Sequence, residues 1–157
     1  MAPSATPAAA KSTDDLGLDL TGKEDLLDRT TFEQILEMDD DDEDREFSKG
    51  LVHGFFEQAE STFDKMEDAI AARDLHEISQ LGHFLKGSSA TLGLTKVKDA
   101  CEKIQHFGAQ KDESGTVDEP DETKSLANIK KTLTEVKDAY KEVAKVLSSF
   151  YQDTESS

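Results

Sequence analysis

The sequence predicts an all-α protein: an antiparallel up-down-up-down four-helix bundle with a short extra N-terminal helix. In four long segments the apolar residues recur every three or four positions, which gives each predicted helix one apolar face. No segment shows the apolar–polar alternation of a half-buried strand. Pro3, Pro7 and Pro120 stand outside these segments, so no proline interrupts their helical hydrogen bonds. Helices of this kind, joined by short connections, bury their apolar faces against one another.

The 157 residues are expected to form one domain with two tails. Residues 1–29, rich at first in Ala, Pro, Ser and Thr and then acidic, are predicted to be a disordered N-terminal tail. Residues 30–152 carry the helical pattern, and residues 153–157 form a C-terminal tail.

The short helix is predicted over residues 31–38, with Thr30 or Thr31 as its N-cap. An acidic run, residues 39–44, follows it. A calcium loop of the EF-hand type needs alternating ligands and a central glycine. This run has neither, so we interpret it as a solvated linker.

The four long helices are predicted, in chain order, over residues 45–72, 74–91, 95–111 and 123–152. The apolar face of the first includes Phe47 and Leu51 near its start. Residues 112–122 are polar and hold Gly115 and Pro120, a composition typical of a loop.

The net charge, the hydropathy and the cysteine content exclude several classes of partner and location. Asp and Glu number 35 against 18 Lys and Arg, a net charge of −17, which repels nucleic acid and anionic membranes. No stretch is apolar enough to span a bilayer, and no signal-peptide pattern begins the chain. The single cysteine, Cys101, excludes an internal disulfide and fits a reducing compartment. It lies on an apolar helix face, where we expect it to pack.

The most informative segment is His83-Phe-Leu-Lys-Gly-Ser-Ser. His83 projects about 140° from the centre of the apolar stripe of its helix, so it is expected to face solvent. Its neighbours one turn away, Ser79 and Gly87, are small. Because a glycine inside a helix costs roughly 1 kcal/mol relative to alanine, we expect a compensating role for Gly87, namely clear access to the imidazole.

Two familiar binding motifs do not fit. Gly82 and Gly87 have the spacing of a phosphate-binding P-loop, but Lys86 stands two positions too early and no strand precedes them. A di-iron bundle needs Glu-x-x-His pairs, and no histidine here has a glutamate three residues before it. Glu102 and His106, one turn apart, are interpreted as a surface ion pair, and no metal site is predicted.

The surroundings of His83 favour one kind of chemistry. Lys86 lies one turn along, where an ammonium group can neutralise a group carried by the imidazole. Ser88 and Ser89 add hydroxyl groups nearby. A neutral, nucleophilic imidazole beside a cation and a flat surface is suited to accept a phosphoryl group from another macromolecule.

This segment resembles the H-x-L-K-G-S-S/A signature of histidine-containing phosphotransfer (HPt) proteins. The acidic run followed by Phe47-Ser-Lys-Gly-Leu, and the segment Cys101-Glu-Lys-Ile-Gln, are similar to the fungal phosphorelay intermediates of the osmosensing two-component pathway. The resemblance covers roughly residues 30 to 152.

The resemblance implies a phosphocarrier without kinase activity of its own. His83 would accept a phosphoryl group from the receiver aspartate of a hybrid sensor histidine kinase and pass it to the receiver aspartate of a response regulator. It implies no cofactor in this chain, because Mg²⁺ is held by the partner receiver. It also implies a monomer in the cytoplasm and nucleus, with no nucleic-acid or membrane partner.

The resemblance also assigns roles to residues. His83 would be the phosphoacceptor through Nε2, and Lys86 would stabilise the phosphoryl oxygens. Gly87 would permit close approach of the receiver, Ser88 would orient the imidazole, and Gln105 would line the pocket. The residues implied in receiver docking are Ile35, Met38, Phe47, Leu51 and Phe84.

Three points stay open at this level. Family members often carry an arginine where this chain has Ala109, and Lys111 is a possible substitute. His76, two turns before His83, is a rival acceptor without the following lysine and glycine. The alternative functions are a non-catalytic acidic helical-bundle adaptor, whose binding would not depend on His83, and a metal-binding bundle.

Overall fold

The structure, a computed structural model, describes residues 26–39 and 45–156, with side chains described as far as residue 151. Its helices are α2 (Arg29–Leu36), α3 (Glu46–Ala71), α4 (Leu75–Leu92), α5 (Thr95–Gly108) and α6 (Glu122–Ser156). No helix in these ranges combines the length and apolarity needed to cross a membrane.

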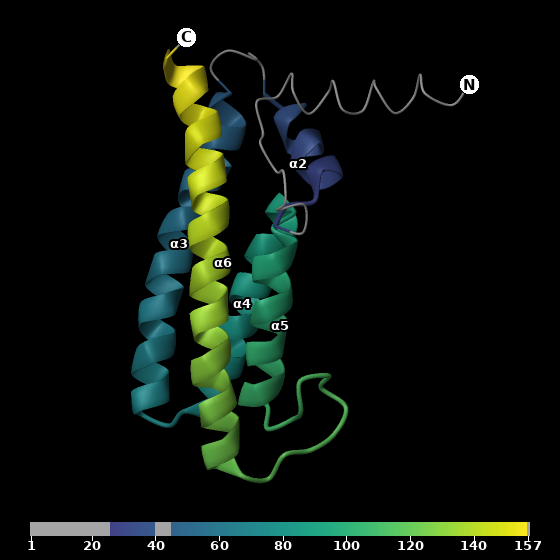
Figure 1. The fold of residues 1–157 in the computed structure, drawn as a ribbon, viewed down its shortest axis with the longest axis vertical. Coiled ribbons are helices and arrows are strands. Elements are labelled where there is room, and N and C mark those ends of the chain that lie inside the picture. Colours follow the sequence, from purple (N-terminus) through teal and green to yellow (C-terminus); the bar gives the residue numbers. More distant parts are fainter. Residues whose placement is uncertain (1–25, 40–44, 157) are drawn as a thin grey trace, which may run out of the picture.

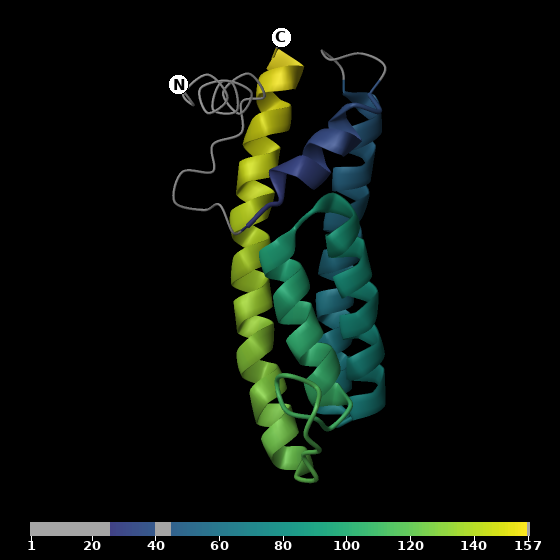
Figure 2. The same ribbon diagram turned by 90° about the vertical axis from the view of Figure 1, so that its right-hand side faces the viewer.

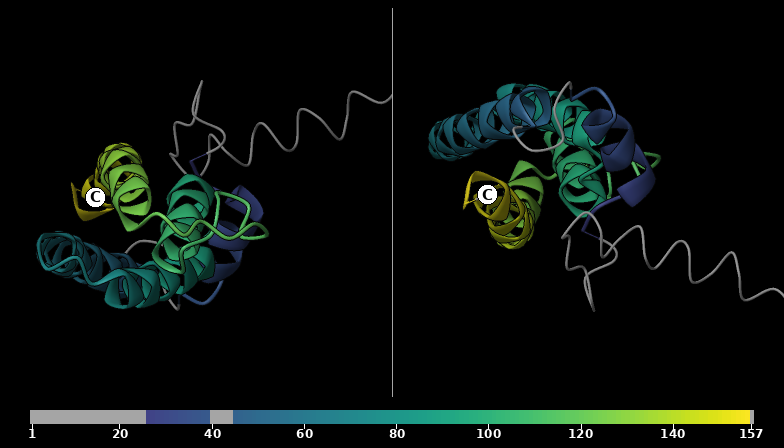
Figure 3. Two further views of the ribbon diagram at one scale, coloured as in Figure 1. Left: turned by 90° about the horizontal axis from the view of Figure 1, so that it is seen from below. Right: turned by 90° about the horizontal axis from the view of Figure 1, so that it is seen from above.

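The long helices form the predicted up-down-up-down bundle (Figure 1). Helices α3 and α5 run in one direction, while α4 and α6 run in the other. Helix α2 lies obliquely across the end of the bundle where α3 begins and α4 ends (Figure 2). Seen end on, the long helices surround a common interior (Figure 3). The prediction of an all-α bundle with a short extra helix is confirmed.

Most predicted apolar faces do form the core, with differences at the first long helix. Phe47 and Leu51 are exposed, and Val52 is buried instead. Leu26 and Leu27 are buried, so the packed region begins before the predicted boundary at residue 30. Helices α5 and α6 match their predicted apolar faces most fully. Their buried apolar residues are Val97, Ala100, Cys101, Ile104 and Phe107 of α5, and Leu126, Ile129, Leu133, Val136, Tyr140, Val143, Leu147 and Phe150 of α6.

The start of α2 differs from the prediction. Asp28, rather than Thr30 or Thr31, is its N-cap, and the Asp28 carboxylate accepts hydrogen bonds from both threonine N–H groups. The Asp28 backbone N–H donates to the Gly93 carbonyl at 2.7 Å. Gly93 has φ +77°, and an added Cβ would lie 2.9 Å from the Asp28 carbonyl oxygen. A glycine at the turn between α4 and α5 therefore lets α2 pack against it.

The acidic run is not entirely solvated as predicted. Asp39 is buried, and its carboxylate accepts hydrogen bonds of 2.8 Å from the Ser48 backbone N–H and from Ser48 Oγ. Tyr151 donates its hydroxyl to Ser48 Oγ at 2.8 Å, and burial raises the pKa of Tyr151 to about 12. Asp39 therefore accepts a hydrogen bond from a backbone N–H group in the first turn of α3, and Ser48 links this turn to α6. Residues 40–44 lie outside the described ranges.

Helix α5 ends at Gly108, three residues before the predicted end. Gln110 has φ +60°, a left-handed conformation that stops a helix. The Asp112 carboxylate then accepts hydrogen bonds from the backbone N–H groups of Gly115, Thr116 and Val117. These bonds organise the turn that begins the connection to α6.

Cys101 packs in the core as predicted, and this has a chemical consequence. Its side chain is fully buried, and burial raises the pKa of the thiol to about 12. Because the thiolate is the reactive form, we expect iodoacetamide at pH 8 to leave the folded protein unmodified and to alkylate Cys101 readily in denaturant. Mass spectrometry of the two samples measures this difference, and rapid modification of the folded protein would contradict the burial.

Candidate functional site: an exposed histidine on α4

His83 lies on the solvent-facing side of α4, and its side chain is exposed as predicted. Gly87, one turn further along, is also exposed, and a Cβ placed there would meet no atom within 4 Å. The imidazole therefore stands on a helix surface that a large partner can approach without meeting a side chain at residue 87.

Lys86 lies on the same side of α4 but is already paired. Its Nζ is 3.1 Å from Glu102 Oε2 on α5. That hydrogen bond is the main reason that the pKa of Glu102 lies below its ordinary value. The predicted Glu102–His106 pair makes no direct contact within 4 Å among the described residues, although the charge of His106 also helps to lower the pKa of Glu102. His106 instead donates from Nδ1 to the Glu113 carbonyl at 2.8 Å.

Gln105 lies at a close contact between α4 and α5. A Cβ on Gly82 would be 2.9 Å from the Gln105 backbone nitrogen, and Ser79 Oγ donates to the Gln105 carbonyl at 2.9 Å. The side-chain oxygen of Gln105 is buried and has no hydrogen-bond partner among the described residues. A buried acceptor without a partner is uncommon in folded proteins.

Ser88 does not take the predicted role of orienting the imidazole. Its Oγ donates to Gln58 Oε1 on α3 at 3.3 Å. Residues five apart on a helix point about 140° away from each other, so Ser88 faces α3 rather than the ring of His83. Ser89 Oγ is buried and donates to the Leu85 carbonyl of its own helix. The groove that Ser88 helps to line has a volume of about 240 Å³ and lies between α3 and α4.

The predicted docking residues divide into two groups. Ile35 is only 7% exposed and packs in the core, so it offers little surface to a receiver. The other four are large apolar side chains that remain accessible. Their exposed fractions are 62% for Met38, 46% for Phe47, 38% for Leu51 and 48% for Phe84. Val117, 59% exposed in the connection before α6, was not predicted and lies apart from them in the sequence.

The remaining candidate residues, Lys111 and His76, each interact with another side chain. Lys111 Nζ pairs with Asp118 Oδ1, so it is not the free cation that would replace an arginine at Ala109. His76 Nε2 accepts a hydrogen bond from the Gln80 side chain at 3.0 Å. The described residues contain no group of three or more His, Cys, Asp or Glu side chains that could hold a metal ion.

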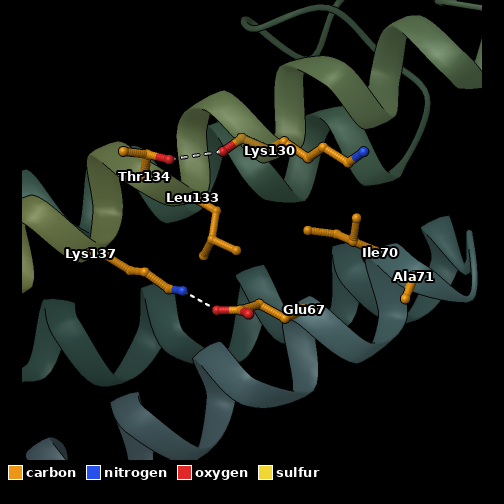
Figure 4. A pocket seen from close by; sticks show the side chains of 7 residues that line it. All are labelled: Glu67, Ile70, Ala71, Lys130, Leu133, Thr134 and Lys137. Atoms are coloured by element: carbon orange, nitrogen blue, oxygen red, sulfur yellow. Dashed lines mark hydrogen bonds and ion pairs between the residues drawn. The ribbon is translucent and has the colours of Figure 1, made fainter.

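A second cavity, of about 370 Å³, lies between α3 and α6. In Figure 4 Lys137 and Glu67 pair at this groove, and Leu133 and Ile70 project toward it. None of the predicted site residues lines it, so this cavity is separate from the surface around His83.

A helical bundle with an exposed histidine beside a lysine and an open glycine is the arrangement expected of a histidine phosphotransfer domain. A family model described as the Hpt domain matches residues 50–145, and the chain belongs to this family.

Among its relatives is Multistep phosphorelay regulator 1 of Schizosaccharomyces pombe, 48% identical over 131 residues, which are 83% of this chain and 44% of that protein. The phosphorelay intermediate protein YPD1 of Saccharomyces cerevisiae is 46% identical over 85 residues, 54% of this chain and 50% of that protein. The chain thus spans about half the length of the curated relatives it matches.

Solved structures agree with this relationship. The S. cerevisiae histidine phosphotransfer protein Ypd1, crystallised with the receiver domain of its downstream response regulator Ssk1, matches with a TM-score of 0.70. The two chains are 34% identical, and the match covers 81% of this chain and 95% of that one.

Proposed function

We propose that this protein is a phosphorelay intermediate that carries a phosphoryl group on His83. The observation that carries the proposal is the exposed imidazole of His83, which stands beside Lys86 and the open surface at Gly87. Membership of the Hpt family supports the same conclusion.

The proposed transfer is a displacement at phosphorus. The Nε2 lone pair of His83 attacks the phosphoryl group of a receiver aspartyl phosphate, and the P–O bond to the aspartate breaks. The bonding electrons return to the aspartate as a carboxylate, while the new P–N bond makes a phosphoramidate. The ring proton on Nδ1 can then leave to solvent. The Lys86 ammonium stabilises charge on the phosphoryl oxygens, and the reverse displacement passes the group to a second receiver.

The proposed partners are the receiver domain of a hybrid sensor histidine kinase and those of response regulators, and the proposed setting is osmosensing in the cytoplasm and nucleus. The names of the fungal relatives support phosphorelay partners, and the solved Ypd1–Ssk1 complex supports a receiver. Met38, Phe47, Leu51 and Phe84 offer exposed apolar surface for docking, as a transient interface with a polar rim requires. The monomeric protein would need no cofactor of its own, because the magnesium ion would sit in the receiver.

The direct test is incubation with a receiver domain carrying a labelled aspartyl phosphate. We expect label on this chain that is acid-labile and alkali-stable, and that maps to residue 83. Adding a second, unlabelled receiver should remove it. Label on another residue would contradict the assignment. An adaptor without covalent chemistry would bind receivers and acquire no label.

Gly87→Gln tests the role of the open surface. We expect the variant to stay folded, because glutamine favours a helix more than glycine does and a Cβ at residue 87 meets no described atom within 4 Å. The added side chain should obstruct the receiver and weaken binding by about tenfold or more, roughly 1.4 kcal/mol. Isothermal titration with a receiver measures the affinity, and an unchanged value would show that residue 87 lies outside the contact.

A further inference from the structure

Lys86, one turn along α4 from the proposed phosphoacceptor, is paired with a carboxylate. Lys86 Nζ lies 3.1 Å from Glu102 Oε2, and the exposed fractions of the two side chains are 32% and 44%. The contact joins α4 to α5, one turn along α4 from His83. The inference below rests on the proposed function, because it concerns what this pair does when a phosphoryl group arrives.

The other candidate sources of charge do not replace Lys86. Ala109 carries no charge, and Lys111 is paired with Asp118. The Lys86 hydrogen bond keeps the pKa of Glu102 below its ordinary value, so Glu102 is ionised at neutral pH. A phosphoryl group on His83 would add a charge of about −1.5 to −2. Two anionic groups, the Glu102 carboxylate and the phosphoryl oxygens, would then compete for one ammonium group.

We propose that Glu102 is a positioning residue for phosphoryl transfer that acts through Lys86. In the free protein it holds the ammonium group near His83. In the phosphorylated protein it competes for that ammonium group and so limits how strongly Lys86 stabilises the phosphohistidine. The competition raises the tendency of the phosphohistidine to give up its phosphoryl group, which suits a carrier that must release what it accepts.

The direction of the effect follows from the charges. Glu102→Gln removes the competing carboxylate and releases Lys86 to the phosphoryl oxygens. We therefore expect the equilibrium with a phosphorylated receiver to shift toward phosphorylated carrier by about two- to fivefold, the size typical of partly exposed ion pairs. The half-life of the phosphohistidine in the isolated carrier should also become longer. Glu102→Asp, which keeps the charge, should return both values toward those of the original protein.

A matched control is available in another ion pair between helices. Lys96 on α5 pairs with Glu142 on α6 at 3.6 Å, and the exposed fractions are 46% and 41%. Glu142→Gln removes the same charge from a comparable ion pair that does not involve α4. We expect it to leave the transfer equilibrium and the half-life unchanged.

The decisive experiment measures the transfer equilibrium for the original protein, Glu102→Gln, Lys86→Ala and the double variant. If Glu102 acts through Lys86, the shift caused by Glu102→Gln should largely disappear in the Lys86→Ala background. A full shift in that background would overturn the inference, as would an equal shift with Glu142→Gln or no shift with Glu102→Gln. Label on His83 of the original protein keeps the proposed function in place in each of these cases, whereas absence of label would refute that function itself.

Discussion

Replacing His83 with glutamine is expected to leave the bundle folded and to abolish phosphoryl uptake from a phosphorylated receiver. The side chain is exposed on α4, so its replacement creates no cavity, and glutamine is a better helix former than histidine. Uptake should be lost because the nitrogen lone pair of an amide is delocalised into its carbonyl and does not attack phosphorus. Labelling with a phosphorylated receiver measures uptake, and circular dichroism follows the fold.

His76→Gln is the matched control for this experiment. His76 is exposed on the same helix, two turns before His83, and the substitution makes the same chemical change. We expect the control to be labelled at the normal rate. Normal labelling of His83→Gln, or loss of labelling in His76→Gln, would move the acceptor away from residue 83.

Gly108→Ala is expected to lower the free energy of unfolding by about 2 kcal/mol, through overpacking. A Cβ at residue 108 would lie 2.6 Å from the Ser79 backbone nitrogen and 2.8 Å from the Leu75 carbonyl oxygen. Backbone atoms cannot rotate away as a flexible side chain can, so α4 and α5 would have to separate. The gain of helix propensity from alanine is small here, because Gly108 is the last residue of α5.

The same substitution at Gly87 should have the opposite sign. A Cβ there meets no described atom within 4 Å, so alanine brings only its helix propensity and should stabilise the fold by about 0.5–1 kcal/mol. Urea unfolding of both variants measures the two free energies. Equal effects at residues 87 and 108 would show that the close contact between α4 and α5 does not limit stability.

Gly87 and Gly108 show that the role of a glycine in a helix cannot be predicted from the residue type alone. Both occur in helical segments of the sequence, and a stability cost was expected for Gly87. In the structure Gly87 faces open space, while Gly108 permits two helices to touch. Only the position of the neighbouring helix distinguishes a glycine that opens a surface from a glycine that closes a contact.

The site could be predicted in part. The exposure of His83 followed from its angle to the apolar stripe, because that angle depends on helix geometry within a single segment. The surroundings of Ser88 and Ile35 were not predicted, because they depend on contacts with other helices. Ser88 meets Gln58 of α3, and Ile35 is covered when α2 folds across the end of the bundle.

The ion pair of Glu102 shows the same limit. In the sequence its nearest candidate partner was His106, one turn away on the same helix. In the structure Glu102 accepts a hydrogen bond from Lys86, which is 16 residues away in the chain. No spacing rule within one helix predicts a contact between two helices, because their relative rotation is set by how their side chains pack.

The helices, most of their apolar faces and the exposure of His83 could be predicted from the sequence, since each depends on residues within a few turns of one another. Tertiary structure decided the partners: Glu102 for Lys86, Ser48 for Asp39, and the core for Ile35. These contacts join segments that are distant in the chain, and they form only when packing fixes the distances between helices.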